Sequence, residues 1–336
     1  MVINDLVHFY SYNHSPVFSF LEFPNQTHNL HTCETVVISP YNLNLDTQRS
    51  TLMGFLSSGY KIIVDASTEI LGGDTVEFIM GVEDPSNIMV YTNTYEPHFE
   101  SDVKSIRMNG GVITVIPFFI KDIDQYKPKY TNNIIKHKDF LLLSGKSKPT
   151  RTSMVGLLSY YNLIEKGHVS FFGNGLSDNK SKFFYDQTSD YFDKTDAPQD
   201  QQEKVRKGLS KLPQKMTLDV NNLTHEISHT RTYNGDYYNS VDFVVVVESD
   251  VREEIIFITE KTMKCIQQNK KFILFSTSGS LSFIKDQVKL HLNKDISHLT
   301  DWCDTSYDNT TDTWERLNKV VSIIKDNTRK DYEYSL

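Results

Sequence analysis

The stretch that decides the fold is Asp242-Phe-Val-Val-Val-Val-Glu248, followed by Ile258-Thr-Glu-Lys-Thr262. An uninterrupted run of β-branched apolar residues is typical of a strand buried on both faces, as in a parallel sheet covered by helices. Thr259 is a favourable N-cap residue, so a helix is expected to begin there. Glu248 then lies at the carboxyl end of a buried strand, where open α/β sheets bind their ligands.

The same alternation of strand-like and helix-like segments extends over most of the chain. The expected strands are residues 36–39, 61–65, 87–91, 112–119, 140–143, 168–172, 242–247 and 271–275. The expected helices are residues 46–59, 96–108, 151–167, 259–270 and 314–324. Such alternation predicts parallel sheets flanked by helices.

The polar stretches divide this pattern into two α/β units in tandem. Residues 121–138 are interpreted as a linker, and residues 175–240 as a long polar insertion or loop. We therefore expect an N-terminal Rossmann-like domain over residues 1–138 and a C-terminal one over residues 139–336.

Composition supports a two-domain protein and excludes some classes. The chain has 336 residues, 38% of them hydrophobic, and a net charge of −8, which implies no global attraction to nucleic acid. The three cysteines are far apart and form no CxxC pair, which favours a reducing compartment. With no signal peptide and no apolar run near the ~18 residues of a spanning helix, we expect a cytoplasmic protein without membrane insertion, in the host cell if the protein is viral.

The expected helix start at Thr259 has the chemistry of a phosphate site. Free N–H groups and the positive end of the helix dipole favour phosphate, and Lys261 adds a full charge. Glu260 or Glu248 can accept hydrogen bonds from ribose hydroxyls. The alternative is that Glu260 only stabilises the helix dipole and that Lys261 is a solvated surface charge.

A second basic segment, Ser144-Gly-Lys-Ser-Lys-Pro-Thr-Arg151, lies at an expected strand-to-helix junction. An arginine there can hold a diphosphate through its planar, bidentate fork, and Lys146 and Lys148 lie beside it. The segment lacks the Gly-Lys-Ser/Thr ending of a Walker A loop. A basic surface loop is the alternative interpretation.

This order of motifs resembles the α1,3-fucosyltransferase family. It is more similar still to fucosyltransferase-like glycosyltransferases of large phages, in which a TEKT helix start precedes an apolar strand and a GSL turn. The matching segments here are Thr259–Thr262, Phe272–Phe275 and Ser278–Leu281. The resemblance covers residues 139 to about 325, whereas residues 1–138 match only in their α/β pattern.

The resemblance implies a glycosyltransferase of the GT-B type, with two Rossmann-like domains facing across a cleft and the donor bound mainly by the C-terminal one. The implied donor-binding residues are Lys146, Arg151, Glu248, Thr259, Glu260 and Lys261. The family's Glu-Asn-Ser reads Glu248-Ser249-Asp250 here, and its lysine before that strand is missing from Tyr237-Tyr-Asn-Ser240. The sugar and the nucleotide are therefore left open.

A catalytic base is expected from the N-terminal domain, because an inverting transfer needs a group that takes the proton of the acceptor hydroxyl. Asp65 and Glu69 follow the strand at residues 61–64, and His98 lies in Tyr95-Glu-Pro-His98. Each of these residues taken singly also fits a helix cap or an exposed surface position.

Two rival classes remain. His225-Glu-Ile-Ser-His229 matches the HExxH pattern of zinc metalloproteases, although its polar surroundings lack a helical apolar stripe. His28-Asn-Leu-His31 has metal-like spacing but no further ligands nearby. The other class is a sugar-nucleotide binding protein without catalytic activity.

The expected partners are a nucleotide sugar as donor and an acceptor hydroxyl on a glycan or on a hydroxymethylated base of viral DNA. No cofactor or metal is expected to be required. Five basic residues without an intervening acid could follow DNA phosphates: Lys204, Arg206, Lys207, Lys211 and Lys215. A solvated polar loop is the alternative.

Overall fold

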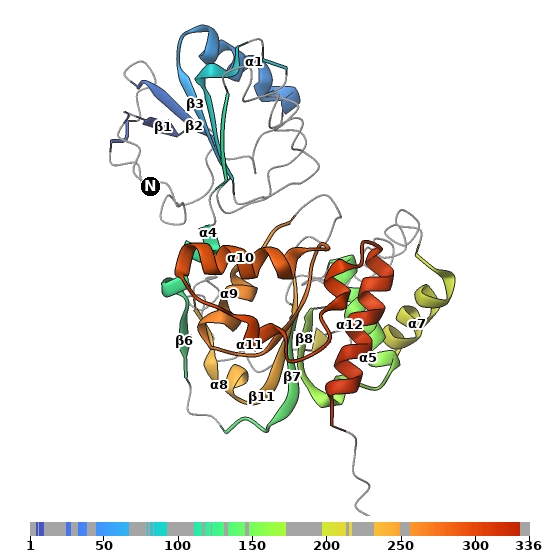
Figure 1. Cartoon of the computed structure of the whole chain (residues 1–336). Coiled ribbons are helices and arrows are strands. Elements are labelled where there is room, and N and C mark those ends of the chain that lie inside the picture. Colours follow the sequence, from blue (N-terminus) through green and yellow to red (C-terminus); the bar gives the residue numbers. More distant parts are fainter. Residues whose placement is uncertain are drawn as a thin grey trace, which may run out of the picture. The chain divides into compact units, whose positions relative to one another are not determined.

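The computed structural model describes seventeen sets of residues. They are residues 5, 7–9, 25–27, 33–38, 45–66, 79, 81–82, 84–92, 111–115, 118–121, 123–130, 134–144, 148–172, 197–212, 215–216, 232–248 and 256–329. The chain divides into two compact units, each described separately below (Figure 1). Unit 1 comprises Met1–Lys121 and Glu254–Phe257, and unit 2 comprises Asp122–Glu253 and Ile258–Leu336.

Unit 1 contains a parallel sheet in the order β1-β2-β3-β4-β5. Its elements are β1 (Val7–Phe9), β2 (Thr35–Ile38), α1 (Leu45–Ser57), β3 (Lys61–Ala66), the 3-10 turn η4 (Pro85–Asn87), β4 (Ile88–Thr92), β5 (Val112–Val115) and α4 (Phe118–Lys121). The strands lie side by side in the order in which they occur in the chain, so the described part of this sheet contains no topological switch point.

The core of unit 1 follows from the register of its strands. Ile38, Val64 and Val90 lie opposite one another on β2, β3 and β4, and all three are buried. They cluster with Leu52 and Phe55 of α1, so α1 packs on this face of the sheet. These contacts explain why α1 forms where the apolar spacing predicts a helix.

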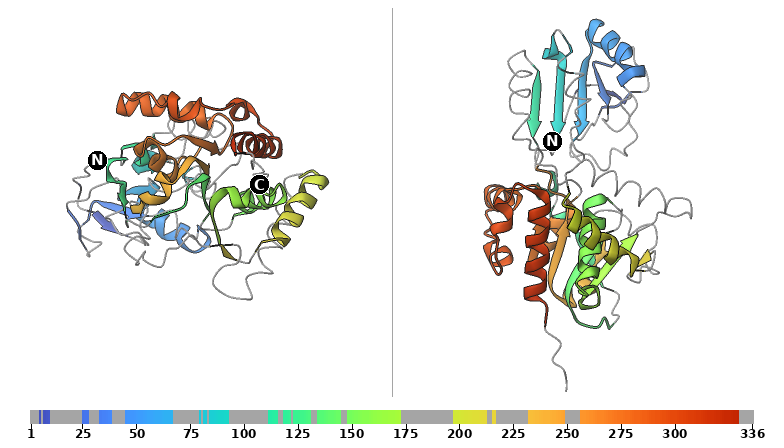
Figure 2. Two further views of the ribbon diagram at one scale, coloured as in Figure 1. Left: turned by 90° about the horizontal axis from the view of Figure 1, so that it is seen from below. Right: turned by 90° about the vertical axis from the view of Figure 1, so that its right-hand side faces the viewer.

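Unit 2 contains a second five-stranded sheet, in the order β12-β11-β7-β8-β9. All pairs are parallel except β8 with β9. In the sheet and its helices the elements are β7 (Lys138–Ser144), α5 (Pro149–Tyr160), η6 (Ile164–Lys166), β8 (Gly167–Phe172), α7 (Gln199–Ser210), β9 (Lys215–Met216), α8 (Gly235–Asn239), β11 (Val241–Val247), α9 (Glu260–Gln267), β12 (Phe272–Phe275), α10 (Ser280–Leu292), α11 (Ser297–Thr300), η8 (Ser306–Asn309) and α12 (Thr313–Asn327). Figure 2 shows the helices that flank this sheet.

The valine run forms β11 as predicted. Every residue of β11 except Asp242 is buried, and β11 pairs with β7 on one side and with β12 on the other. The prediction of an α/β chain with parallel sheets is therefore confirmed.

The segments expected to be linker and insertion contain regular structure. β6 (Lys127–Lys129) follows the turn η5 (Ile123–Gln125) and pairs with β10 (Thr232–Asn234), so the contacts assign residues 122–138 to unit 2. These two short strands are polar and carry no apolar period, which is why sequence alone suggested a linker. The division between the units thus falls at Lys121 rather than at 138.

Within the expected insertion, α7 packs along α5 at a close helix crossing. A Cβ on Gly208 would lie 1.8 Å from the Gly156 carbonyl oxygen, so glycine is required there. The Ser159 hydroxyl donates to the Gly208 carbonyl at 2.8 Å. The interpretation of residues 175–240 as loop is wrong for α7, because two buried apolar residues, Val205 and Leu209, and a glycine contact suffice to anchor this helix.

Two further expectations differ from the structure. The strand expected at 112–119 ends at Val115, and α4 begins at Phe118 just after Pro117, which suits the end of a strand. The turn expected at Ser278–Leu281 leads into a helix, α10, that the sequence analysis did not predict. The helix expected at residues 96–108 lies outside the described residues.

Candidate functional site

The carboxyl edge of the unit 2 sheet contains a topological switch point between β7 and β11. From β7 the chain continues through α5 to β8 on one side, and from β11 it continues through α9 to β12 on the other. Because such connections are right-handed, α5 and α9 lie on opposite faces of the sheet and both begin at the switch point. Open α/β sheets bind their ligands at such a position.

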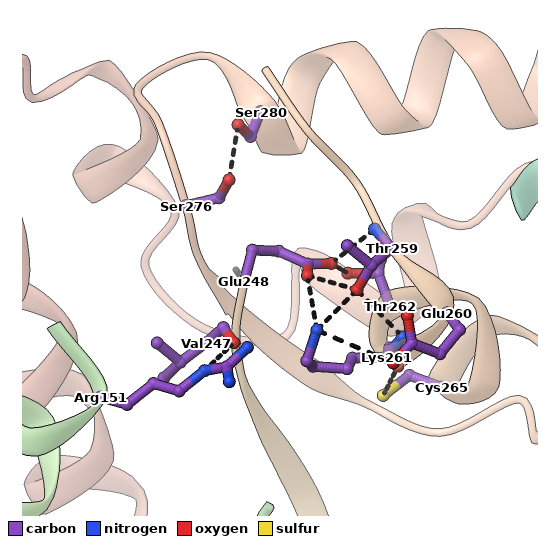
Figure 3. Close-up of polar contacts among 10 residues, drawn as sticks. All are labelled: Arg151, Val247, Glu248, Thr259, Glu260, Lys261, Thr262, Cys265, Ser276 and Ser280. Carbon is purple, nitrogen blue, oxygen red and sulfur yellow. Dashed lines mark hydrogen bonds and ion pairs between the residues drawn. The ribbon is translucent and has the colours of Figure 1, made fainter. Parts of the chain in front are cut away.

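Glu248 directly follows β11, and its side chain is fully buried. One carboxylate oxygen, Oε1, accepts hydrogen bonds from the Thr259 amide at 3.0 Å and the Thr262 hydroxyl at 2.7 Å. The other, Oε2, accepts from the Thr259 hydroxyl at 2.6 Å and from Lys261 Nζ at 3.4 Å (Figure 3). A carboxylate offers about four acceptor positions, so these four contacts use its capacity. Glu248 thus ties the start of α9 to the end of β11 and has no acceptor position left for a ribose.

The start of α9 is closed by the chain's own groups. Thr259 has the extended backbone of an N-cap, and its hydroxyl accepts a hydrogen bond from the Lys261 amide at 3.4 Å. The same hydroxyl accepts from Lys261 Nζ at 2.8 Å. Thr259 therefore caps the helix start at which a phosphate site was expected. Any ligand contact at this end of α9 would come from side chains such as those of Glu260 and Lys261.

Lys261 and Glu260 form the partly exposed side of this network. Their charged groups lie 3.8 Å apart, and the side chains remain 22% and 18% exposed. Burial raises the pKa of the Glu260 carboxyl, but Lys261 and Lys264 offset this effect, and the net pKa lies below its ordinary value. Glu260 is therefore ionised at neutral pH and can accept hydrogen bonds from a ligand hydroxyl.

Arg151, the third residue of α5, connects the two sides of the switch point. Its Nε donates to the Val247 carbonyl at the end of β11 at 3.4 Å, and only 4% of the residue is exposed (Figure 3). Burial lowers the pKa of the guanidinium, while Glu248 and Glu260 raise it. The net effect lowers the pKa of Arg151 from its ordinary value, but an arginine side chain is not deprotonated in proteins, so the group stays charged. The predicted donor-binding residues Arg151, Glu248, Thr259, Glu260 and Lys261 are thus brought together at one edge of the sheet.

The remaining predicted residues lie apart from this cluster or outside the described residues. Asp65 belongs to β3 of unit 1, where it lies opposite Tyr91 and is 7% exposed. The structure gives no description of Lys146, Glu69 or His98.

The metal motifs are also beyond the described residues, since both the HExxH segment at 225–229 and the pair His28 and His31 lie there. Within the ranges that are described, no group of three or more His, Cys, Asp or Glu side chains is arranged to hold a metal ion. The same ranges contain no helix long and apolar enough to cross a membrane.

The basic residues of α7 are largely engaged on their own helix. Lys204 pairs with Asp200 at 2.7 Å, Lys207 pairs with Glu203 at 2.8 Å, and Arg206 donates to Gln202. Lys211 lies over the ring of Tyr160. Two of the five basic residues that suggested a track for DNA phosphates are therefore paired with acidic neighbours on α7.

A second acidic anchor at this edge was not predicted. The buried Asp308 accepts hydrogen bonds from the amides of Leu281 at 2.9 Å and Ser282 at 3.0 Å, which caps α10. Burial raises the pKa of Asp308 although these bonds lower it. No local pattern could have indicated this contact, because 26 or 27 residues separate the partners.

Comparison with known proteins gives no relative: no protein-family model, curated protein or solved structure matches the chain.

Proposed function

We propose that the protein is a glycosyltransferase that moves a sugar from a nucleotide-sugar donor to an acceptor hydroxyl. The observation that carries the proposal is that cations from the starts of α5 and α9 both bond to the end of β11 at the switch point of the unit 2 sheet. Arg151 donates to the Val247 carbonyl, and Lys261 pairs with the Glu248 carboxylate. In this proposal the donor nucleotide lies at the carboxyl edge of that sheet, as ligands do in open α/β folds.

The charges of the cluster support a phosphorylated ligand. Arg151 and Lys261 face the two carboxylates of Glu248 and Glu260, and Lys264 adds a third cation whose charge acts on both carboxylates. Because Glu248 is taken up by internal hydrogen bonds, the ribose contact passes to Glu260. An ionised, partly exposed carboxylate is suited to accept the hydrogen bonds of a ribose diol.

The same cations would serve the reaction. As the bond between the sugar and the diphosphate breaks, negative charge grows on the leaving diphosphate, and fixed positive groups stabilise it. The proton of the acceptor hydroxyl must pass to a base, for which Asp65, Glu69 and His98 are the candidates. A GT-B arrangement with this base in the N-terminal domain is part of the proposal, as is an acceptor that is a glycan or a hydroxymethylated base.

Donor hydrolysis in the absence of acceptor tests the proposal. The full chain is incubated with GDP- and UDP-sugars, and the release of nucleoside diphosphate is measured. We expect slow release that Lys261→Ala reduces and that Lys289→Ala, which removes an exposed lysine of α10, leaves unchanged. If the donor binds but no nucleoside diphosphate is released, the protein is instead a sugar-nucleotide binding protein. The absence of both binding and release would refute the proposal.

A further inference from the structure

Three buried hydroxyl groups of unit 2 have no hydrogen-bond partner in the described part of the chain. They are Ser144 Oγ, Thr152 Oγ1 and Ser153 Oγ. Ser144 and Ser153 are fully buried, and Thr152 is 3% exposed. Buried polar groups nearly always have a partner, so three unpartnered hydroxyls in one region require an explanation.

All three belong to the junction between β7 and α5. Ser144 is the last residue of β7, and Thr152 and Ser153 are the fourth and fifth residues of α5. Thr152 and Ser153 directly follow Arg151 and lie within the first two turns of α5. The hydroxyls thus share the β7 side of the switch point with Arg151.

The first turn of α5 differs from the other helix starts near the carboxyl edge. Lys148 at the N-cap position forms no side-chain capping bond, Pro149 begins the helix, and the first turn contains no acidic residue. By contrast, Thr259 caps α9 and the Asp308 carboxylate caps α10. Among the residues that the structure describes, no side chain therefore accepts a hydrogen bond from the first turn of α5, as Thr259 and Asp308 do at the other two helices.

We propose that the end of β7 and the start of α5, with the hydroxyls of Ser144, Thr152 and Ser153, bind a phosphate group of the ligand. The inference rests on the proposed function and deepens it by assigning the donor diphosphate to the start of α5 rather than to that of α9. Phosphate oxygens only accept hydrogen bonds, whereas hydroxyls and the amides of a first turn can donate them. The Arg151 guanidinium supplies positive charge at the same junction.

Titration calorimetry on the full chain tests this site, with inorganic pyrophosphate, GDP and UDP as probes. We expect pyrophosphate to bind and Thr152→Val or Ser153→Ala to weaken it about tenfold, the loss of one hydrogen bond to a charged group. Neither change should lower the melting temperature without ligand, because neither hydroxyl has a protein partner to lose. Ser144→Ala provides a third variant at the strand end.

Ser159→Ala is the matched control, since this hydroxyl is buried on the same helix but bonded to the Gly208 carbonyl. It should reduce stability and leave pyrophosphate affinity unchanged. Affinities unaltered in the Ser144, Thr152 and Ser153 variants would overturn the inference and indicate that the hydroxyls hold only water. If GDP or UDP bound equally well to these variants, the proposed function would stand without this site. If pyrophosphate bound through the hydroxyls but no nucleotide bound more tightly, the site would stand and the proposed function would fall.

Discussion

At the scale of single residues, the Glu248 carboxylate holds the cluster together through four hydrogen bonds. Glu248→Ala leaves the Thr259 amide and the Thr262 hydroxyl buried without their acceptor and removes one of the two carboxylates that pair with Lys261. We expect the free energy of unfolding to fall by about 2–4 kcal/mol, somewhat below the usual cost of breaking a buried ion pair because Lys261 is partly solvated.

Urea unfolding followed by tryptophan fluorescence measures this loss in unit 2 alone. Both tryptophans, Trp302 and Trp314, belong to that unit. Glu315→Ala is a suitable control, since Glu315 forms an exposed pair with Lys319, and it should change stability by no more than about 0.5 kcal/mol. A Glu248→Ala protein as stable as the control would contradict the structural role of this carboxylate.

Glu260 should make the stability of unit 2 depend on pH. Its folded pKa lies below the unfolded value of about 4.3. A depressed acid pKa contributes stability above the unfolded value and loses it as the pH falls through the folded pKa. The difference in unfolding free energy between wild type and Glu260→Gln should therefore be largest near neutral pH and shrink in acid. Urea unfolding across this range checks the sign, and a difference that grows toward acid would refute it.

The sequence indicated the members of the cluster but not the bonds between them. Arg151, Glu248, Glu260 and Lys261 were all found from their positions at strand ends and helix starts. The contacts of Glu248 with Thr259, Lys261 and Thr262 join residues 11 to 14 positions apart in the chain, and no local pattern encodes them. For the same reason, spacing pointed to a phosphate site at α9, although this start is capped.

At the scale of secondary-structure elements, the crossing of α5 and α7 depends on Gly208. A methyl group there would lie against the Gly156 carbonyl, and moving the helices apart would cost about 1–3 kcal/mol, as overpacking does. Gly208→Ala should lower the melting temperature measured by circular dichroism. Gly54→Ala, on α1 with open space around it, should raise stability by about 0.5–1 kcal/mol. Equal effects of the two changes would contradict the close crossing.

Elements with long apolar runs were predictable, and elements held by tertiary contacts were not. β7, β11 and β12 follow from continuous apolar segments that only a covered sheet can bury. By contrast, α7 has few apolar residues, and the short strands β6 and β10 form by pairing with each other across about a hundred residues of chain. Local β-propensity cannot predict pairing with a strand so far away in the sequence.

At the scale of the whole molecule, the proposed sugar transfer requires no zinc. The rival metalloprotease class rests on the HExxH segment at residues 225–229, and zinc content together with a substitution in this segment tests it. We expect purified protein to contain less than stoichiometric zinc by elemental analysis and His225→Ala to retain donor hydrolysis. One tightly bound zinc per chain, together with loss of function in that variant, would favour the rival class.

The two units differ in the strand order of their sheets and in the position of the clustered cations. Among the described strands, only the five-stranded sheet of unit 2 has a topological switch point, which lies between β7 and β11. Arg151 and Lys261 bond to the end of β11 at this point. The central claim is therefore that a nucleotide binds at the carboxyl edge of unit 2, between β7 and β11.

Hydrogen–deuterium exchange of the full chain, with and without saturating GDP or UDP, tests this claim most directly. We expect slower exchange in peptides that contain the first turns of α5 and α9, with peptides of β1–β4 largely unchanged. Slower exchange confined to unit 1, or no change with any nucleoside diphosphate, would contradict it.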